Sequence, residues 1–287
     1  MGRLAIIGAV TLQAIGKVAY GTWLESFPAP LFVFISFTFT ASFFLLISRQ
    51  GRGEIAWGTL ALLNIATALT FLSLFYALKL VEPSIVGAVE IAIGPLVAVL
   101  IAWVASRKTP SRTNVVVCFG ILTGCAILSV SALMGPGLPS GDFSVLIGLA
   151  ASSVAGIGAV LITIGSKSLL NRGWKIGAVL AHRFYVIVPL SLALSFGAET
   201  TSIIWSAHLV LVVLIVSVIS VLAPLYLLQI GIGRCTPYTV LVTMSALPVL
   251  TFAIEGFSSR YEWSPVTAIG LIVITATVLW DVSTKKT

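Results

Sequence analysis

Ten long apolar segments follow one another along the 287-residue chain. Each is close to the roughly 20 residues that an α-helix needs to cross the hydrocarbon core of a bilayer. The segments are continuous apolar runs, whereas the strands of a membrane barrel alternate apolar and polar residues. The sequence therefore predicts an all-α integral membrane protein. Its ten transmembrane helices are expected over residues 4–23, 30–48, 56–78, 84–104, 114–133, 144–166, 177–197, 207–231, 237–256 and 265–282.

Charged residues are scarce in this chain. Hydrophobic residues make up 59% of it and charged residues only 9%, whereas a soluble domain usually carries about a quarter charged residues. The formal net charge is +7, but the basic residues stand in short segments between apolar runs. A nucleic-acid-binding protein would gather them on one exposed face. The composition therefore points to the lipid bilayer as a partner and argues against nucleic acid.

Lysine and arginine favour one side of the predicted topology. Of the 16 basic residues, only Lys79 and Arg260 lie in the loops of the other side, and Lys17 and Arg183 lie inside apolar segments. Cytoplasmic loops are enriched in lysine and arginine. We therefore expect a multi-pass protein of the cell (inner) membrane with both termini in the cytoplasm. The remaining twelve basic residues, all on the cytoplasmic side, are Arg3, Arg49, Arg52, Arg107, Lys108, Arg112, Lys167, Arg172, Lys175, Arg234, Lys285 and Lys286.

A stretch rich in glycine and proline at residues 135–141 divides the segments into two sets of five. Because five is an odd number, the second set would enter the membrane from the opposite side, so a repeat must be inverted. The I-G-P-L at 93–96 and the A-L-P-V at 246–249 stand at corresponding places. We expect a first five-helix repeat over 1–138 and a second, inverted one over 139–287, an architecture that is common among carriers.

Proline and glycine interrupt several apolar segments. Gly94 and Pro95 in one repeat match Pro248 in the other, and Pro224 interrupts the segment 207–231. Proline removes a helical hydrogen bond and bends the helix axis. Paired interruptions in corresponding helices point to the binding region of a carrier. We therefore expect these four residues to act as hinges or gates.

Lys17 and Glu90 are ionisable residues inside apolar segments, where a charge costs roughly 2.5–3.5 kcal/mol on insertion scales. Each lies about six residues from the outer end of its segment, a depth of roughly 9–10 Å. The matched depths predict an ion pair or a shared ligand. Lys17 would then bind a substrate carboxylate, and Glu90 an ammonium group or a coupling proton. The alternative is a buried structural salt bridge.

Two further charged residues lie near the ends of apolar segments. Arg183, next to His182, is about six residues into the segment 177–197, and a long arginine side chain can extend to the membrane interface. We expect Arg183 to reach the interface in this way, with a gating or substrate role as the alternative. Glu255 lies close to the outer end of its segment, where we expect it to be hydrated.

Uncharged polar residues inside the segments form a second group of candidates. They could hydrogen-bond a zwitterionic substrate, or they could join neighbouring helices in contacts worth under about 1 kcal/mol each. Gln13 and Tyr20 lie near the helical face of Lys17 because they are four and three residues away from it. The others are Asn64, Thr67, Tyr226, Gln229, Thr243 and Ser245.

The sequence contains no motif for an enzyme. It lacks H-E-x-x-H, G-x-S-x-G, a Walker A loop and G-x-G-x-x-G. Its two histidines, His182 and His208, are expected on opposite sides of the membrane, so a histidine-based metal site is not expected. We therefore expect no catalytic residue, metal or cofactor, and transport driven by gradients of substrate or protons.

The segments 77–100 and 248–265 resemble the drug/metabolite transporter superfamily, specifically its EamA-type ten-helix carriers. Glu262, with Ser264 and Pro265, is similar to the family's glutamate near a Ser-Pro, and Arg183-Phe184 looks like the family's Arg-Phe. In the first half, Ser36 stands where that arginine would be, and Lys108 replaces the glutamate. The V-E-I-A-I-G-P-L segment is similar to the fourth helix of threonine/homoserine exporters.

This resemblance implies a secondary transporter that exports amino acids or related small metabolites by alternating access. The alternatives are efflux of amphipathic organic cations, for which Glu90 offers one deep acidic residue, and sugar-phosphate exchange, which would need more cations than Lys17. A non-transporting membrane scaffold or an intramembrane enzyme is a further alternative, against which the paired interruptions and the missing catalytic motifs count.

Overall fold

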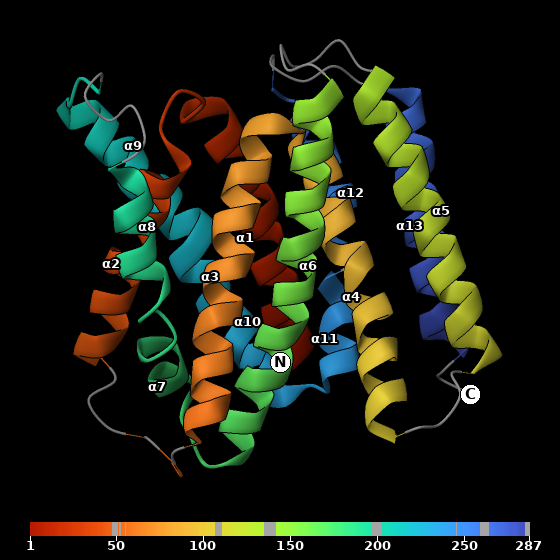
Figure 1. Cartoon of the computed structure of the whole chain (residues 1–287), viewed down its shortest axis with the longest axis horizontal. Coiled ribbons are helices and arrows are strands. Elements are labelled where there is room, and N and C mark those ends of the chain that lie inside the picture. The colour runs from red at the N-terminus through yellow and green to blue at the C-terminus, as the bar shows by residue number, and fades with distance from the viewer. Residues whose placement is uncertain are drawn as a thin grey trace.

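The computed structural model describes residues 1–47, 51, 53–54, 56–106, 111–134, 142–196, 203–244, 246–258 and 264–284. Every regular element within these ranges is helical, as the sequence predicts. The helices stand side by side in one bundle, and both marked ends of the chain lie in the lower half of the view in Figure 1.

Thirteen α-helices and one π-helix make up the described part of the chain. Most predicted segments correspond to one helix each, and the bounds below follow the chain. The helices are α1 (Gly2–Trp23), α2 (Ala29–Ile47), α3 (Trp57–Leu80), α4 (Pro83–Ser106), α5 (Arg112–Met134), α6 (Asp142–Asn171), α7 (Ile176–Ala181), α8 (Ile187–Ser195), α9 (Ala207–Ser217), η2 (Val218–Leu222), α10 (Ala223–Arg234), α11 (Pro237–Met244), α12 (Leu247–Glu255) and α13 (Pro265–Thr284).

Five helical stretches in the described residues are long and apolar enough to cross a membrane: Gly2–Trp23, Ala29–Ile47, Trp57–Leu80, Phe143–Asn171 and Ala207–Arg234. Three more predicted segments correspond to α4, α5 and α13, which are single helices of 24, 23 and 20 residues. The predicted segment 177–197 is instead two short helices, α7 and α8, and the segment 237–256 contains α11 and α12. The count of ten spans stays a prediction.

Large apolar side chains cover much of the outer surface. Trp57, Phe119 and Leu46 are 73%, 67% and 68% exposed. An extended apolar surface of this kind marks a contact with lipid or with another protein. Together with a mean hydropathy of +1.14 and the long apolar helices, it identifies a membrane protein.

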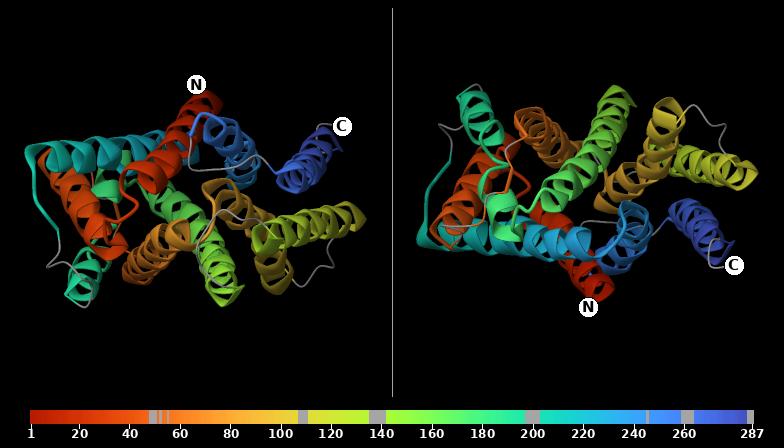
Figure 2. Two further views of the ribbon diagram at one scale, coloured as in Figure 1. Left: turned by 90° about the horizontal axis from the view of Figure 1, so that it is seen from above. Right: turned by 90° about the horizontal axis from the view of Figure 1, so that it is seen from below.

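The helices pack against neighbours that are often distant in the sequence. The most extensive contact joins α3 to α6, and the contact between α1 and α10 is also large. In addition, α4 packs on α6, α12 on α1, α2 on α8 and α5 on α13. Figure 2 shows α5 and α13 together at one end of the bundle.

The expected interruptions have different outcomes. Gly94 and Pro95 do not divide α4, which continues to Ser106, because a proline removes only one hydrogen bond and neighbouring helices can hold the axis. Near Pro248, in contrast, one helix ends and another begins, because α12 starts at Leu247. Pro224 follows a π-helical turn, η2, at the start of α10. The expected match between Gly94-Pro95 and Pro248 is therefore not seen in the secondary structure.

Candidate functional site

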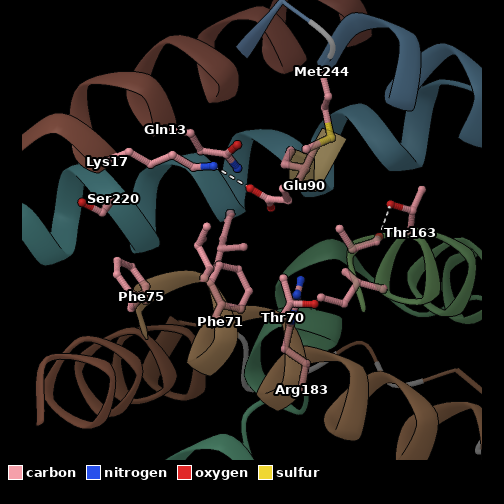
Figure 3. A pocket seen from close by; sticks show the side chains of 15 residues that line it. Gln13, Lys17, Thr70, Phe71, Phe75, Glu90, Thr163, Arg183, Ser220 and Met244 are labelled. Carbon is pink, nitrogen blue, oxygen red and sulfur yellow. Dashed lines mark hydrogen bonds and ion pairs between the residues drawn. The ribbon is translucent and has the colours of Figure 1, made fainter. Parts of the chain in front are cut away.

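A narrow cavity lies inside the bundle, between helices from both parts of the chain (Figure 3). It has about 40 Å³ of room for the centres of water molecules, and one water needs about 10–15 Å³. A metabolite therefore does not fit without movement of the walls. The lining residues are Gln13 and Lys17 of α1, Thr70, Phe71, Leu74 and Phe75 of α3, Glu90 of α4, Ala159, Ile162 and Thr163 of α6, Arg183, Ser220 of η2, Leu225 and Leu228 of α10, and Met244 of α11.

Lys17 and Glu90 meet in this cavity as an ion pair. The Nζ atom of Lys17 lies 2.5 Å from Oε2 of Glu90, and the residues are 5% and 7% exposed. Figure 3 shows α1 and α4 bringing the two side chains together. The matched depth in the sequence thus predicted a real contact. A charge in an apolar interior is stable only with a partner, so each of these residues depends on the other.

Two glycines of α6 allow its close approach to the cavity walls. A Cβ atom on Gly158 would lie 2.1 Å from Oγ1 of Thr70 on α3. A Cβ atom on Gly156 would lie 2.4 Å from the carbonyl oxygen of Glu90 on α4. Small residues at such positions let helix backbones pack closely. They fix Thr70 and the backbone of Glu90 relative to α6.

The helix that carries Arg183 is broken at this residue. α7 ends at Ala181 and α8 begins at Ile187, and Asn64 of α3 bridges the gap. Its Nδ2 donates to the carbonyl oxygen of His182 at 2.9 Å, and its Oδ1 accepts from the backbone N–H of Tyr185 at 2.8 Å. An unpaired buried backbone group is costly, so Asn64 stabilises the break by replacing lost helical hydrogen bonds.

The break directs Arg183 inward, and the expectation that it extends to the membrane interface is wrong. Arg183 is 1% exposed and lines the cavity. Its Nε atom donates to Oγ1 of Thr67 at 3.3 Å. In a continuous helix the long side chain could follow the helix outward, but here the irregular backbone between α7 and α8 turns it towards the cavity.

The other predicted polar residues have several positions. Of these residues, only Gln13 joins Lys17, Glu90 and Arg183 in the lining of the cavity. Asn64 supports the backbone of the break, and Thr67 accepts a hydrogen bond from Arg183. The residues that do not line the cavity are Tyr20, buried against Phe32 and Phe75; Tyr226, 43% exposed and stacked on Phe44; Gln229, fully buried; and Thr243, whose hydroxyl donates to the carbonyl oxygen of Thr239. Ser245 lies outside the described residues.

One other expectation from the sequence is wrong, and others concern residues that the structure does not describe. Glu255 is not hydrated: it is 4% exposed, and its Oε1 accepts from the backbone N–H of Ser84 at 2.7 Å. It therefore caps the first turn of α4, where a negative charge is favourable. Lys108 and Glu262 lie outside the described residues, as does the predicted divide at 135–141.

Sequence reasoning missed Thr70, Thr163 and Ser220 as cavity residues. Thr70 and Thr163 each donate to a carbonyl oxygen one turn earlier in their helix, at 2.8 Å. Their oxygens can still accept a hydrogen bond. Ser220 belongs to η2, and its Oγ has no hydrogen-bond partner among the described residues. The nearby Pro224 was the available signal, because π-helical turns are frequent at functional sites.

Comparison with known proteins gives one family and one fold. Residues 1–130 match the model of the EamA-like transporter family. No curated protein matches the chain. A solved structure described only as "Crystal structure of protein" superposes with a TM-score of 0.66 at 18% identity, covering 96% of this chain and 94% of that chain. The first part of the chain is thus similar to EamA-like transporters, and the chain shares its fold with a known structure over 96% of its length.

Proposed function

We propose that this protein is a secondary transporter that exports amino acids or related small metabolites across a bacterial-type inner membrane by alternating access. The EamA-like domain over residues 1–130 supports a membrane transporter of the drug/metabolite superfamily. The observation that carries the proposal is the ion pair of Lys17 and Glu90 inside a cavity enclosed by long apolar helices. Ionisable residues within a membrane protein commonly mark a substrate or proton pathway.

The two parts of the chain would be inverted five-helix repeats, over 1–138 and 139–287. The packing pattern supports this assignment. In this assignment α1 corresponds to α6, α3 to the unit α9–η2–α10, and α4 to the unit α11–α12. The contact of α3 with α6 then corresponds to that of α10 with α1. The contact of α4 with α6 likewise corresponds to that of α12 with α1. Two interchangeable halves give a carrier two conformations of similar energy.

Both termini would be cytoplasmic. Twelve basic residues lie on that side of the predicted topology, and the two marked ends of the chain lie in the same half of the bundle (Figure 1). The resemblance of the V-E-I-A-I-G-P-L segment at 89–96 to threonine/homoserine exporters supports amino acids and the outward direction.

Lysines join helix ends at opposite ends of the bundle. The ammonium group of Lys79 on α3 donates to the carbonyl oxygens of Leu24 and Glu25 after α1. The ammonium group of Lys167 on α6 donates to the carbonyl oxygens of Ile232 and Gly233 on α10 at 3.0 and 3.2 Å. With both ends joined and the cavity narrow, we interpret this conformation as occluded. Opening would separate one pair of helix ends, with Gly94, Pro95, Pro224 and Pro248 as candidate hinges.

The test is counterflow of radiolabelled amino acids into liposomes that contain the purified protein, with and without a pH gradient. Glu90→Gln should reduce counterflow by about tenfold or more, since each tenfold step corresponds to 1.4 kcal/mol of lost interaction. The matched control is Glu54→Gln, because Glu54 pairs with Arg172 at 3.7 Å on the surface and its side chain is 78% exposed.

Three outcomes would count against the proposal in different ways. No counterflow of any amino acid would overturn the substrate. Counterflow of an amphipathic organic cation alone would favour drug-type efflux. Equal counterflow and equal pH dependence in Glu90→Gln and Glu54→Gln would leave Lys17 and Glu90 with a structural role only.

A further inference from the structure

Among the residues that the structure describes, Arg183 has the largest fully buried side chain, with 1% of its surface exposed. It lies in the break between α7 and α8 and points into the cavity in Figure 3. Two features of the fold place it there. Asn64 holds the backbone on both sides of Arg183, and Oγ1 of Thr67 accepts from its Nε atom at 3.3 Å. Residues of α3 therefore determine where the guanidinium lies.

The guanidinium has unused hydrogen-bonding capacity. Its Nη2 atom has no hydrogen-bond partner in the described part of the chain. The two ion pairs found among the described residues are Lys17 with Glu90 and Arg172 with Glu54, so neither includes Arg183. The ring of Phe184, 5.6 Å from Cζ of Arg183, gives only a weak contact with the cation.

The charges that line the cavity do not balance. Lys17 and Glu90 neutralise each other at 2.5 Å, and Arg183 is the remaining charged residue of the lining. The lining thus carries one excess positive charge. A buried charge is costly unless it is paired, and arginine cannot lose its proton under ordinary conditions. An anion that enters the cavity would remove this cost.

We infer that Arg183 binds the carboxylate of the transported substrate, an inference that rests on the proposed transport function. A guanidinium matches a carboxylate through two parallel N–H···O bonds, and the free Nη2 can supply one of them. This assignment moves the carboxylate site from Lys17, which is already paired, to Arg183. Glu90 remains available for an ammonium group or a proton.

The inference predicts which class of substrate is accepted. Amino acids and simple carboxylic acids satisfy Arg183, whereas an amine without a carboxylate leaves it unpaired and adds a second positive charge. A site that holds an unsatisfied buried polar group discriminates strongly against ligands that cannot pair with it. The same argument disfavours organic cations as substrates.

Matched ligand sets test this prediction. One set is leucine, 4-methylpentanoate and 3-methylbutylamine; another is threonine, 3-hydroxybutanoate and 1-amino-2-propanol. Within each set the acid is the amino acid without its amino group, and the amine is the amino acid without its carboxylate. Binding is measured as thermal stabilisation of the purified protein in detergent, in sodium chloride and in sodium gluconate, and counterflow is measured for labelled leucine and threonine.

The amino acid and the acid of a set should bind, and the amine should not. Arg183→Gln should weaken binding of the acid by about tenfold or more, as for the loss of hydrogen bonds to a charged group. Arg183→Lys should retain part of the affinity because it keeps the charge but loses the bidentate geometry. Arg172→Gln is the matched control, because Arg172 pairs with Glu54 on the surface, where its side chain is 41% exposed, and it should bind as the unmodified protein does. Elution as a single species in detergent shows that each variant is folded. If Arg183→Gln does not fold, Arg183→Lys is used for the test instead.

The inference is overturned if the amine of a set binds better than the acid, or if the folded Arg183 variants bind the acid as the unmodified protein does. In both cases counterflow can persist, so the transport function survives. Stabilisation by chloride that no carboxylate displaces would also overturn it, by assigning Arg183 to an inorganic anion. If no ligand binds and neither amino acid is moved, the proposed substrate fails and the inference fails with it.

Discussion

α2 and the α7–α8 pair occupy corresponding places in the two proposed repeats and pack against each other. They differ in how each accommodates a buried polar side chain. α2 is one helix of 19 residues. Its fully buried Ser36 lies 2.7 Å from Oγ of Ser217, within hydrogen-bond distance. The other element is broken at Arg183, whose backbone depends on Asn64 and whose Nη2 has no partner in the described chain.

The difference shows how two elements at corresponding places in the proposed repeats can accommodate buried polar groups in different ways. The small hydroxyl group of Ser36 is satisfied by Ser217 of α9, so α2 can stay a continuous helix. A guanidinium needs several acceptors and a place away from lipid, and the break between α7 and α8 supplies that place. Among the described residues, the buried cation outside the two ion pairs, Arg183, therefore lies in the second of the two proposed repeats. This is the place where we propose that a substrate is held.

Ser36→Arg puts into α2 the residue type that the α7–α8 pair accommodates, and it should have the largest effect. It places a charge in a continuous helix that has no counterpart of the α7–α8 break. An uncompensated buried charge costs about 3–5 kcal/mol, so little folded protein should be recovered from detergent. A variant that elutes and melts as the unmodified protein does would show that α2 can accommodate an arginine without a break.

Asn64→Leu should have the next largest effect. It leaves the carbonyl oxygen of His182 and the N–H of Tyr185 without their partner, and each unsatisfied buried group costs about 1–3 kcal/mol. The resistance to unfolding by heat or by SDS should fall, and carboxylate binding should fall with it because Arg183 is no longer positioned. Unchanged melting would mean that the break does not depend on Asn64.

Thr67→Val tests the position of Arg183 while it leaves the hydrogen bonds of Asn64 at the break in place. It removes the acceptor of the Nε–H of Arg183, and a hydrogen bond to a charged group is worth about 1.5–3 kcal/mol. We expect the lower end, because the distance is 3.3 Å. Loss of stability with unchanged carboxylate affinity would show that Thr67 does not position the guanidinium.

Ser36→Ala should have the smallest effect. It removes a neutral hydrogen bond worth about 0.5–1.5 kcal/mol and should leave transport intact. A double-mutant cycle with Ser217→Ala measures this bond directly. A strong loss of transport in the folded Ser36→Ala variant would contradict the assignment of α2 as the non-binding partner of the pair.

The pattern of apolar segments predicted the helical class and five spans that the structure supports, since hydrophobicity and length alone decide whether a helix can cross a bilayer. The contact between Lys17 and Glu90 was also predictable, because equal depth is a property of position along two helices. The roles of Asn64, Thr70 and Arg183 were not predictable in this way. Each depends on which side of a helix meets which neighbour, and apolar helices show little variation around their circumference.

By itself, therefore, the sequence determined that this protein belongs in a membrane, that its helices carry two matched charges, and that a third charge lies near the start of a segment. Only the tertiary structure decided that the third charge turns inward. A long side chain at such a position can reach either the interface or the interior. The direction depends on α3, because its Asn64 stabilises the break between α7 and α8. The local sequence around Arg183 does not predict this break.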